Sequence, residues 1–342
     1  MKYSLMIMSV LIYILLTNVS IARDQIRITG SSTVHPFSTE VSDHFGKDFS
    51  YKKPIVQSTG TGGGMKTFCA GIGEEHPDIV NASRRISQQE SELCRQNGVY
   101  HLIEVHIGYD GIVFANSKRS PKFNFTLKDI YTALADQVPS PYHVGNIVKN
   151  HKSRWSKVNT NLPDKHIWVI GPPKTSGTRD AFEKLIMEPG CSEYRIMRVM
   201  KNKDISQYNQ TCHTIRQDGA YIESGEDDER IVSELSINKS AIGIFGYGFL
   251  SRNQDTLQGS SINGIKPHFD NIANGSYPGH RPLFVYVKKQ HLDLVDGIRE
   301  YIGEFISSRA IGEKGYLVES GLIPLNEKDR QKMVRRVQKA LR

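Results

Sequence analysis

The chain has 342 residues, of which 38% are hydrophobic and 23% charged, and its formal net charge is +8. This length suits two domains, each with a sizeable core, and the surplus of positive charge favours anionic ligands in a general way. Nucleic-acid binding is not predicted, because the basic residues are scattered and not clustered with aromatic residues that stack on bases, apart from a run over residues 328–342.

Residues 1–22 have the pattern of a secretory signal peptide. Lys2 precedes an apolar run over residues 5–16, and residues 20–22 supply a small-residue cleavage site that ends at Ala22. The alternative is a membrane anchor, but the apolar run is shorter than the ~20 residues that span a bilayer. We therefore predict export, with cleavage after Ala22.

From residue 25 onward, a strand-like segment, a turn rich in Gly, Ser and Thr, and a helix-like segment recur in that order. This order is typical of α/β units, because short apolar or alternating runs predict strands and the helical pattern follows at once. The predicted pairs of strand and helix are 25–29 with 36–45, 54–58 with 65–70, 78–83 with 88–97, and 167–170 with 178–187.

The four cysteines form two local pairs, Cys69 with Cys94 and Cys191 with Cys212. Export to an oxidising compartment favours disulfides, and of the three possible pairings we favour the local one. A structural zinc site is the competing interpretation, but it needs short spacings such as C-x2-C, which the sequence lacks.

Two Gly-punctuated stretches predict where the chain passes between two lobes. Residues 101–117 contain two strand-like runs broken at 108–111, and residues 241–250 are punctuated by Gly in the same way. The other predicted elements are a helix over 127–135, a strand at 283–287, a helix over 292–306, and a closing basic helix with Met333, Val334, Val337 and Leu341 on one face. We expect the closing helix to pack on the surface, with membrane binding as the alternative.

Each of the four turns offers groups that bind anions. A helix N-terminus has free backbone N–H groups and the positive end of the helix dipole, a preceding Ser or Thr adds a hydroxyl, and Gly lets the backbone approach a ligand. An ordinary helix cap explains any single turn, whereas their recurrence after strands predicts a shared oxyanion site. The turns are residues 30–33, 58–64, 82–84 and 175–179.

Two arginines follow these turns directly, Arg84 and Arg179. A guanidinium group suits an oxyanion because its planar fork matches two oxygens at once. The alternative for each is a surface or interdomain ion pair.

Several motifs together resemble the periplasmic phosphate-binding protein of the Pst-type ABC importer, the PstS family. They are GSSTVHPFS, STGTGGGMKTFCAG, DIVNASRRIS, SGTRDAF and AIGIFGYGFL, in this order and at these spacings. The resemblance covers about residues 26–324. It implies the type II periplasmic-binding-protein fold: two α/β lobes joined by crossover strands, with phosphate in the cleft. We expect lobe I to comprise residues 24–112 and 253–342, and lobe II residues 113–252.

The resemblance also implies which residues hold the phosphate. They come from all four turns and supply hydroxyls, backbone N–H groups and guanidinium groups: Ser32, Thr33, Val34, Thr61, Gly62, Gly63, Ser83, Arg84, Ser176, Gly177, Thr178 and Arg179.

The chain departs from the family pattern at two places. Some members carry an Asp at the position of Ser83, where it accepts the proton of monohydrogen phosphate and so excludes sulfate. Here the acceptor is Ser83 itself or another group such as Asp78, Asp180 or Asp218. Some members also place an Arg where this chain has Pro172, a role that Arg179 would take over.

The resemblance implies the binding component of a phosphate importer, with inorganic phosphate and a membrane permease as partners. We expect a periplasmic monomer without catalytic residues, metal or cofactor. The alternatives are an exported phosphate-ester hydrolase and an oxyanion-binding protein that serves no transporter. A nucleotide-binding P-loop is set aside, because Met65 stands where GTGGGMKT would need its second glycine.

Overall fold

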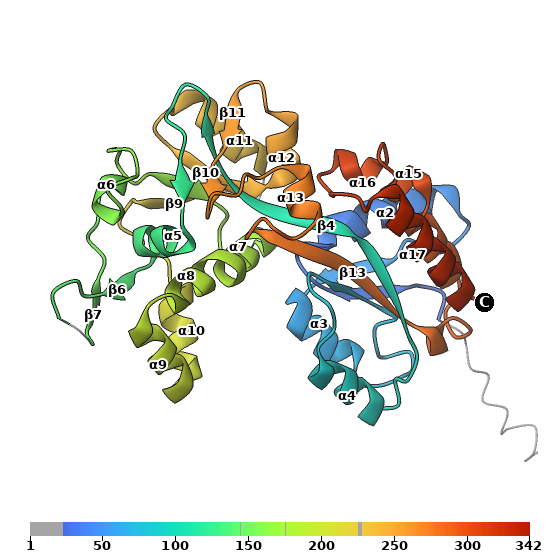
Figure 1. The fold of residues 1–342 in the computed structure, drawn as a ribbon. Coiled ribbons are helices and arrows are strands. Elements are labelled where there is room, and N and C mark those ends of the chain that lie inside the picture. Colours follow the sequence, from blue (N-terminus) through green and yellow to red (C-terminus); the bar gives the residue numbers. More distant parts are fainter. Residues whose placement is uncertain (1–22, 144, 175, 225–227) are drawn as a thin grey trace, which may run out of the picture.

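One long strand, β4 (Leu102–Ser117), runs through both halves of this computed structural model (Figure 1). Over residues 102–111 it pairs antiparallel with β13 (His280–Lys288), and over residues 112–115 it pairs with β10 (Ile242–Gly246). The strand thus changes partners between Gly111 and Ile112. We predicted two strands broken by glycines here; the structure instead has one strand, with an irregular register opposite Leu283 and Phe284.

The structure describes residues 23–143, 145–174, 176–224 and 228–342. The predicted signal peptide therefore lies outside the described residues. Among the helices within these ranges, none is both long and apolar enough to cross a membrane.

The main sheet is mixed and has the strand order β2-β1-β3-β13-β4-β10-β8-β9, with β11 paired to β4. Parallel pairing joins β1 to β2 and β3, and β8 to β9 and β10, while the strands that run between the halves are antiparallel. The remaining strands are β1 (Arg27–Gly30), β2 (Ile55–Ser58), β3 (Ile79–Ala82), β5 (Asn124–Phe125), β6 (Gln137–Pro139), β7 (Ile147–Lys149), β8 (Val169–Gly171), β9 (Tyr221–Glu223), β11 (Leu257–Gly259) and β12 (Ser261–Ile262).

Helices surround both halves of the sheet (Figure 1). They are α2 (His35–Asp48), α3 (Gly60–Phe68), α4 (Gln88–Gln96), α5 (Leu127–Leu134), α6 (Trp155–Val158), α7 (Gly177–Phe182), α8 (Glu188–Ser192), α9 (Arg195–Lys203), α10 (Ile205–His213), α11 (Asp228–Ile237), α12 (Tyr247–Arg252), α13 (Phe269–Ala273), α14 (Ile298–Phe305), α15 (Ser308–Ile311), α16 (Tyr316–Glu319) and α17 (Glu327–Ala340), with a π-helical turn η1 (Glu183–Met187) and a 3-10 turn η2 (Lys289–His291).

The four predicted strand-to-helix units are all present. Two predicted helices begin at a different residue from the one expected: α3, in the second unit, and α14, which lies outside these units. Helix α3, which follows β2, begins at Gly60 and not near Met65. The Gly-rich segment after β2 is therefore already helical. Helix α14 begins only after Gly297, whose φ of +85° is left-handed, and residues 292–297 precede it. A residue in the left-handed conformation interrupts an α-helix, and glycine adopts this conformation readily because it has no Cβ atom.

The buried side chains form separate cores in the two halves. One core joins β1, β3, β13 and helices α2, α14 and α17, and a smaller one lies under α3 and α4. The third core includes Ile112 and nearly all of the buried apolar side chains up to Tyr277, including Leu257, Ile262 and Ile272. Because residues 257–277 pack in this third core, the chain returns to the first half through β13, whereas we expected the return near residues 241–250.

The bounds of the lobes stay a prediction, and the packing suggests one change to them. We propose that the first boundary lies at residue 112, where β4 changes partners. The second boundary then lies near Gly279, just before β13, and not at residue 252. Strands β4 and β13 would be the two connections between the lobes.

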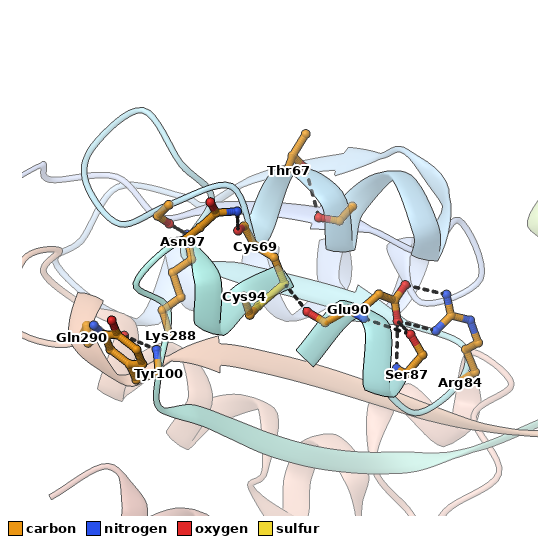
Figure 2. The surroundings of a disulfide bond; sticks show 12 residues. Thr67, Cys69, Arg84, Ser87, Glu90, Cys94, Asn97, Tyr100, Lys288 and Gln290 are labelled. Atoms are coloured by element: carbon orange, nitrogen blue, oxygen red, sulfur yellow. Dashed lines mark hydrogen bonds and ion pairs between the residues drawn. A yellow bond between two sulfur atoms is a disulfide. The ribbon is translucent and has the colours of Figure 1, made fainter. Parts of the chain in front are cut away.

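Both predicted disulfides are confirmed: Cys69 pairs with Cys94, and Cys191 with Cys212. Cys69 follows α3 directly and Cys94 lies in the last turn of α4, so the first disulfide joins the two helices (Figure 2). The side chain of Asn97 adds a hydrogen bond of 2.9 Å to the Cys69 carbonyl. The helices that begin at the second and third turns are therefore held together at their far ends.

Replacing Cys69 and Cys94 together by Ser is expected to lower the free energy of unfolding by about 3 kcal/mol, because the open chain gains conformational freedom when the bridge is lost. The two cysteines are 25 residues apart. Urea unfolding followed by far-ultraviolet circular dichroism measures the change. An unchanged midpoint, with the thiols of the unaltered protein shown to be oxidised, would contradict it.

Candidate functional site

The predicted turns converge on a cleft between the two halves. One cavity of about 320 Å³ is bounded by the turns after β1, β2 and β3 on one side and by α7 and η1 on the other. Seven of the residues predicted from the sequence line this cavity: Ser32, Thr33, Thr61, Gly62, Ser83, Arg84 and Gly177. The other lining residues are Ser31, Gly60, Asp180, Ala181, Lys184, Leu185 and Arg281. The sequence signal of repeated turns thus identified residues that are far apart in the chain and close in space.

A second cavity of about 380 Å³ adjoins the first and shares Ser32, Thr33 and Gly177 with it. Two further predicted residues line this second cavity, Ser176 and Thr178. Asp110, from the crossover strand β4, lies in its wall as well. The two cavities together form one cleft that is interrupted where α7 meets the turn before α2.

The start of α7 touches the turn before α2 directly. The Thr33 hydroxyl donates to the Gly177 carbonyl over 3.4 Å. A Cβ atom on Gly177 would lie 2.3 Å from Ser32 Oγ and 2.7 Å from the Thr33 nitrogen, so no larger residue fits without moving the two segments apart. Glycine at this position permits the closest approach of the two halves.

The second and third turns are joined to each other by hydroxyl groups. Thr61, in the first turn of α3, lies 3.1 Å from Ser83 Oγ and accepts a hydrogen bond of 3.1 Å from the Ser83 backbone nitrogen. Behind them, the hydroxyls of Thr29 and Thr59 are 2.8 Å apart. This network fixes the N-terminus of α3, with its free N–H groups, at the edge of the first cavity.

Arg84 lines the first cavity, and Glu90 holds its guanidinium group. Two parallel hydrogen bonds of 2.8 Å join them, and Glu90 also accepts from the Ser87 backbone and hydroxyl in the capping box of α4 (Figure 2). Burial raises the pKa of Glu90, but the hydrogen bonds from Arg84 and Ser87 outweigh it and lower that pKa to about 2. The Arg84 side chain is 45% exposed, so part of it stays accessible beside the pair.

Arg179 lies behind the cleft and lines neither cavity. Its side chain is 2% exposed; Nε donates to Glu183 over 2.6 Å and one terminal nitrogen donates to the Pro172 carbonyl over 3.3 Å. The guanidinium group also lies over the Tyr221 ring, 5.0 Å from its centre. These contacts fasten the first turn of α7 to the loop before it, and the direct ligand contact that we expected of Arg179 stays a prediction.

Two other expected ligand groups lie outside the lining of both cavities. Val34 is fully buried at the start of α2, and Gly63 is exposed on α3. Of the proton acceptors considered from the sequence, Asp78 is buried against Arg23 and His291, and Asp218 is held by Arg216. Asp180 alone among those three carboxylates lines the cleft.

An ion pair at the floor of the cleft was missed from the sequence. Arg281 on β13 donates to one Asp110 oxygen, Oδ2, over 3.0 Å and 2.7 Å, and the Gly111 nitrogen donates to the other, Oδ1, over 2.8 Å. Both side chains are nearly buried, yet Arg281 lines the first cavity and Asp110 the second. The two residues are 171 positions apart, so no local pattern could join them.

The cleft contains hydrogen-bond donors and charged groups. Within the described ranges, no group of three or more His, Cys, Asp or Glu side chains could hold a metal ion. The arrangement can surround a small anion with hydroxyls, N–H groups and guanidinium groups, and it offers two carboxylates as acceptors, Asp110 and Asp180.

The two-lobed fold with its polar cleft defines a binding protein of the PBP superfamily. Residues 18–309 match the model of that family, described as the PBP superfamily domain. A crystal structure of a possible phosphate binding protein from Planctomyces limnophilus superposes with a TM-score of 0.71 at 26% identity, covering 94% of this chain and 99% of that one. The predicted fold class is confirmed.

Curated relatives show to which family within the superfamily the chain belongs. The phosphate-binding protein PstS of Staphylococcus epidermidis is 32% identical over 273 residues, which cover 77% of this chain and 68% of the relative. Protein SphX of Synechococcus elongatus is 27% identical over 315 residues, which cover 90% of this chain and 80% of the relative. The chain belongs to the PstS family of phosphate-binding proteins, as its motifs indicated.

The pair of Asp110 and Arg281 should behave as a coupled unit in stability measurements. Asp110→Asn or Arg281→Gln alone is expected to lower the free energy of unfolding by about 3 kcal/mol, because each leaves a buried charge without its partner. The double variant should lose clearly less than the sum. Urea unfolding of the four proteins gives the coupling.

The exposed pair of Glu92 and Arg95 provides the matched control for that cycle. Its side chains are 45% and 65% exposed, and solvent screens such pairs, so no measurable coupling is expected there. Additive effects at Asp110 and Arg281 would contradict the assigned pairing.

Proposed function

We propose that the chain captures inorganic phosphate in the cleft and delivers it to the membrane permease of an ABC importer. The observation that carries this proposal is the convergence of three strand-to-helix turns and the start of α7 on one cavity. Hydroxyls and helix N-termini bind oxyanions without any metal or cofactor. The PstS name of the relatives supports phosphate as the anion.

The donors of the cleft match what a desolvated phosphate requires. A charged ligand removed from water is retained only if nearly all its oxygens accept hydrogen bonds. Thr33 and Thr61 offer hydroxyls, α3 offers N–H groups, and Arg84, Arg281 and Lys184 offer positive charge around the same cavity. We propose that Ser176, Gly177 and Thr178 complete the shell from the second half.

We further propose that Asp110 accepts the proton of monohydrogen phosphate. Two carboxylate oxygens offer about four acceptor positions, and Arg281 and Gly111 occupy three of them. The remaining position belongs to a nearly buried carboxylate in the wall of the second cavity, which adjoins the first at Ser32, Thr33 and Gly177. Sulfate carries no proton at neutral pH, so its oxygen would face an unprotonated carboxylate and be repelled.

The crossover strands suggest how binding is coupled to delivery. Phosphate that contacts donors of both halves favours the closed arrangement, and a closed form that the permease recognises follows from that shift in population. Strands β4 and β13 are the connections that would bend. In this proposal the protein is an exported periplasmic monomer with no catalytic role. The names of the relatives support the binding role alone.

Gly177→Ala is expected to weaken phosphate binding at least about tenfold, because its methyl group overlaps Ser32 and Thr33 and holds the halves apart. Isothermal titration of the phosphate-stripped protein measures the affinity. Gly303→Ala on α14 is the control, since nothing lies within 4 Å of the added atom. No heat from the unaltered protein would refute phosphate binding, and an unchanged affinity of Gly177→Ala would refute the closed site.

Asp110→Asn is expected to lower the preference for phosphate over sulfate by about 10- to 100-fold, because an amide can donate to sulfate where the carboxylate repels it. Parallel titrations with the two anions measure the ratio, after circular dichroism has shown a folded protein. Asp180→Asn, which changes the other cleft carboxylate, should leave the ratio unchanged. A drop caused by Asp180→Asn alone would transfer the role to Asp180.

A further inference from the structure

The last helix, α17, presents a row of cations that the cleft does not use. Its apolar face is buried, with Met333, Val337 and Leu341 in the core of the first half. On the exposed side, basic residues recur at alternating spacings of four and three, which places them on one ridge of the helix. This basic ridge consists of Lys328, Lys332, Arg335 and Lys339 on the helix, together with Arg342 just beyond its end.

Within the described part of the chain, no carboxylate neutralises the charges of the basic ridge. None of its side chains forms an ion pair or hydrogen bond with any residue that the structure describes, whereas the neighbouring Arg330 and Arg336 are paired with Glu327 and Glu104. Like charges at such spacings repel each other and destabilise a helix. The repulsion within this row therefore lowers the stability of the folded protein slightly, and an external polyanion would relieve that repulsion.

The shape and composition of this surface distinguish among polyanions. The ridge runs for roughly 20 Å along a straight helix at the outer edge of the first half, away from α7 and the cleft (Figure 1). Every exposed side chain of residues 326–342 is polar. A specific protein interface needs an apolar or aromatic centre, which the ridge itself lacks along its length, while a flat sheet of anionic headgroups needs only a convex row of cations.

A hollow at the C-terminal end of the ridge fits the same ligand. It measures about 470 Å³ and is lined by Tyr100, His101, Lys289 and Ala340 together with residues 102 and 103. The Tyr100 ring is 62% exposed, and an amphipathic ring of this kind is typical of the membrane interface. Lys289 and His101 place further donors beside it for a phosphate headgroup.

We propose that the basic ridge of α17, with the adjoining hollow, is a docking surface for anionic phospholipid. The helix cannot insert, because its apolar residues are buried in the core, so the contact is electrostatic and reversible. Such a contact concentrates the protein at the membrane surface. Because the ridge lies away from the cleft, the contact does not cover the cleft (Figure 1). This inference does not depend on the anion that the cleft binds.

Co-sedimentation with lipid vesicles tests the proposal on the protein that lacks residues 1–22. Vesicles of phosphatidylcholine with about 30% phosphatidylglycerol should bind it at low salt, pure phosphatidylcholine vesicles should not, and about 0.5 M salt should release it because the charges are screened. The ridge variant K328Q/K332Q/R335Q/K339Q/R342Q should bind at least about 100-fold more weakly.

A matched control removes the same number of exposed cations elsewhere, in K118Q/K122Q/K203Q/K239Q/K266Q. This control should keep most of the vesicle binding, and both variants should bind phosphate like the unaltered protein. Equal losses in the two variants, or no binding to phosphatidylglycerol vesicles, would overturn the proposal. Tighter binding to a DNA duplex than to the vesicles at the same salt would overturn the assignment to lipid.

Discussion

The cleft depends on one constraint, which is that β4 belongs to both halves of the molecule. Up to Gly111 the strand is held by β13, and from Ile112 it is held by β10. Because each segment is fixed by its own ladder, a change of angle between the halves is confined to the change of partner. Asp110 and Arg281 lie at that point, in register across β4 and β13. A buried ion pair there joins the two strands laterally at the same point.

The walls of the cleft follow from the way parallel strands end. In β1, β2 and β3 the C-terminal ends lie at the same edge, so the turns that follow them meet even though they are separate in sequence. Gly30 shows how tight this edge is, because a Cβ atom there would lie 2.2 Å from the Asn81 carbonyl oxygen. With the backbone packed so closely, hydroxyls and N–H groups, and not long side chains, become the natural donors. The disulfide between α3 and α4 then keeps two of the turns from drifting apart.

The sequence predicted local features well and long-range partners poorly. The strand, the Gly, Ser or Thr turn and the helix are encoded within about a dozen residues, so these units were found, and most of the residues predicted from the turns line the cleft. The pairing of Asp110 with Arg281 depends on tertiary structure alone. So does the position of Arg179, which Glu183 and Pro172 draw away from the cavity. The lobe boundary was placed near residue 252 for a related reason: residues 257–277 carry no sequence signal for the core in which they pack.

The placement of the cations separates two kinds of role. In and behind the cleft, Arg84, Arg179 and Arg281 are each held by a carboxylate, which orients the guanidinium group. A ligand then meets groups that are already in place, so little side-chain freedom is lost on binding. Among the residues that the structure describes, the ridge on α17 has no such partners. Its side chains keep their freedom, which suits a diffuse surface of headgroups that has no fixed geometry to match. Pairing within the protein thus marks the cations that must be positioned, and its absence marks those that act through their charge alone.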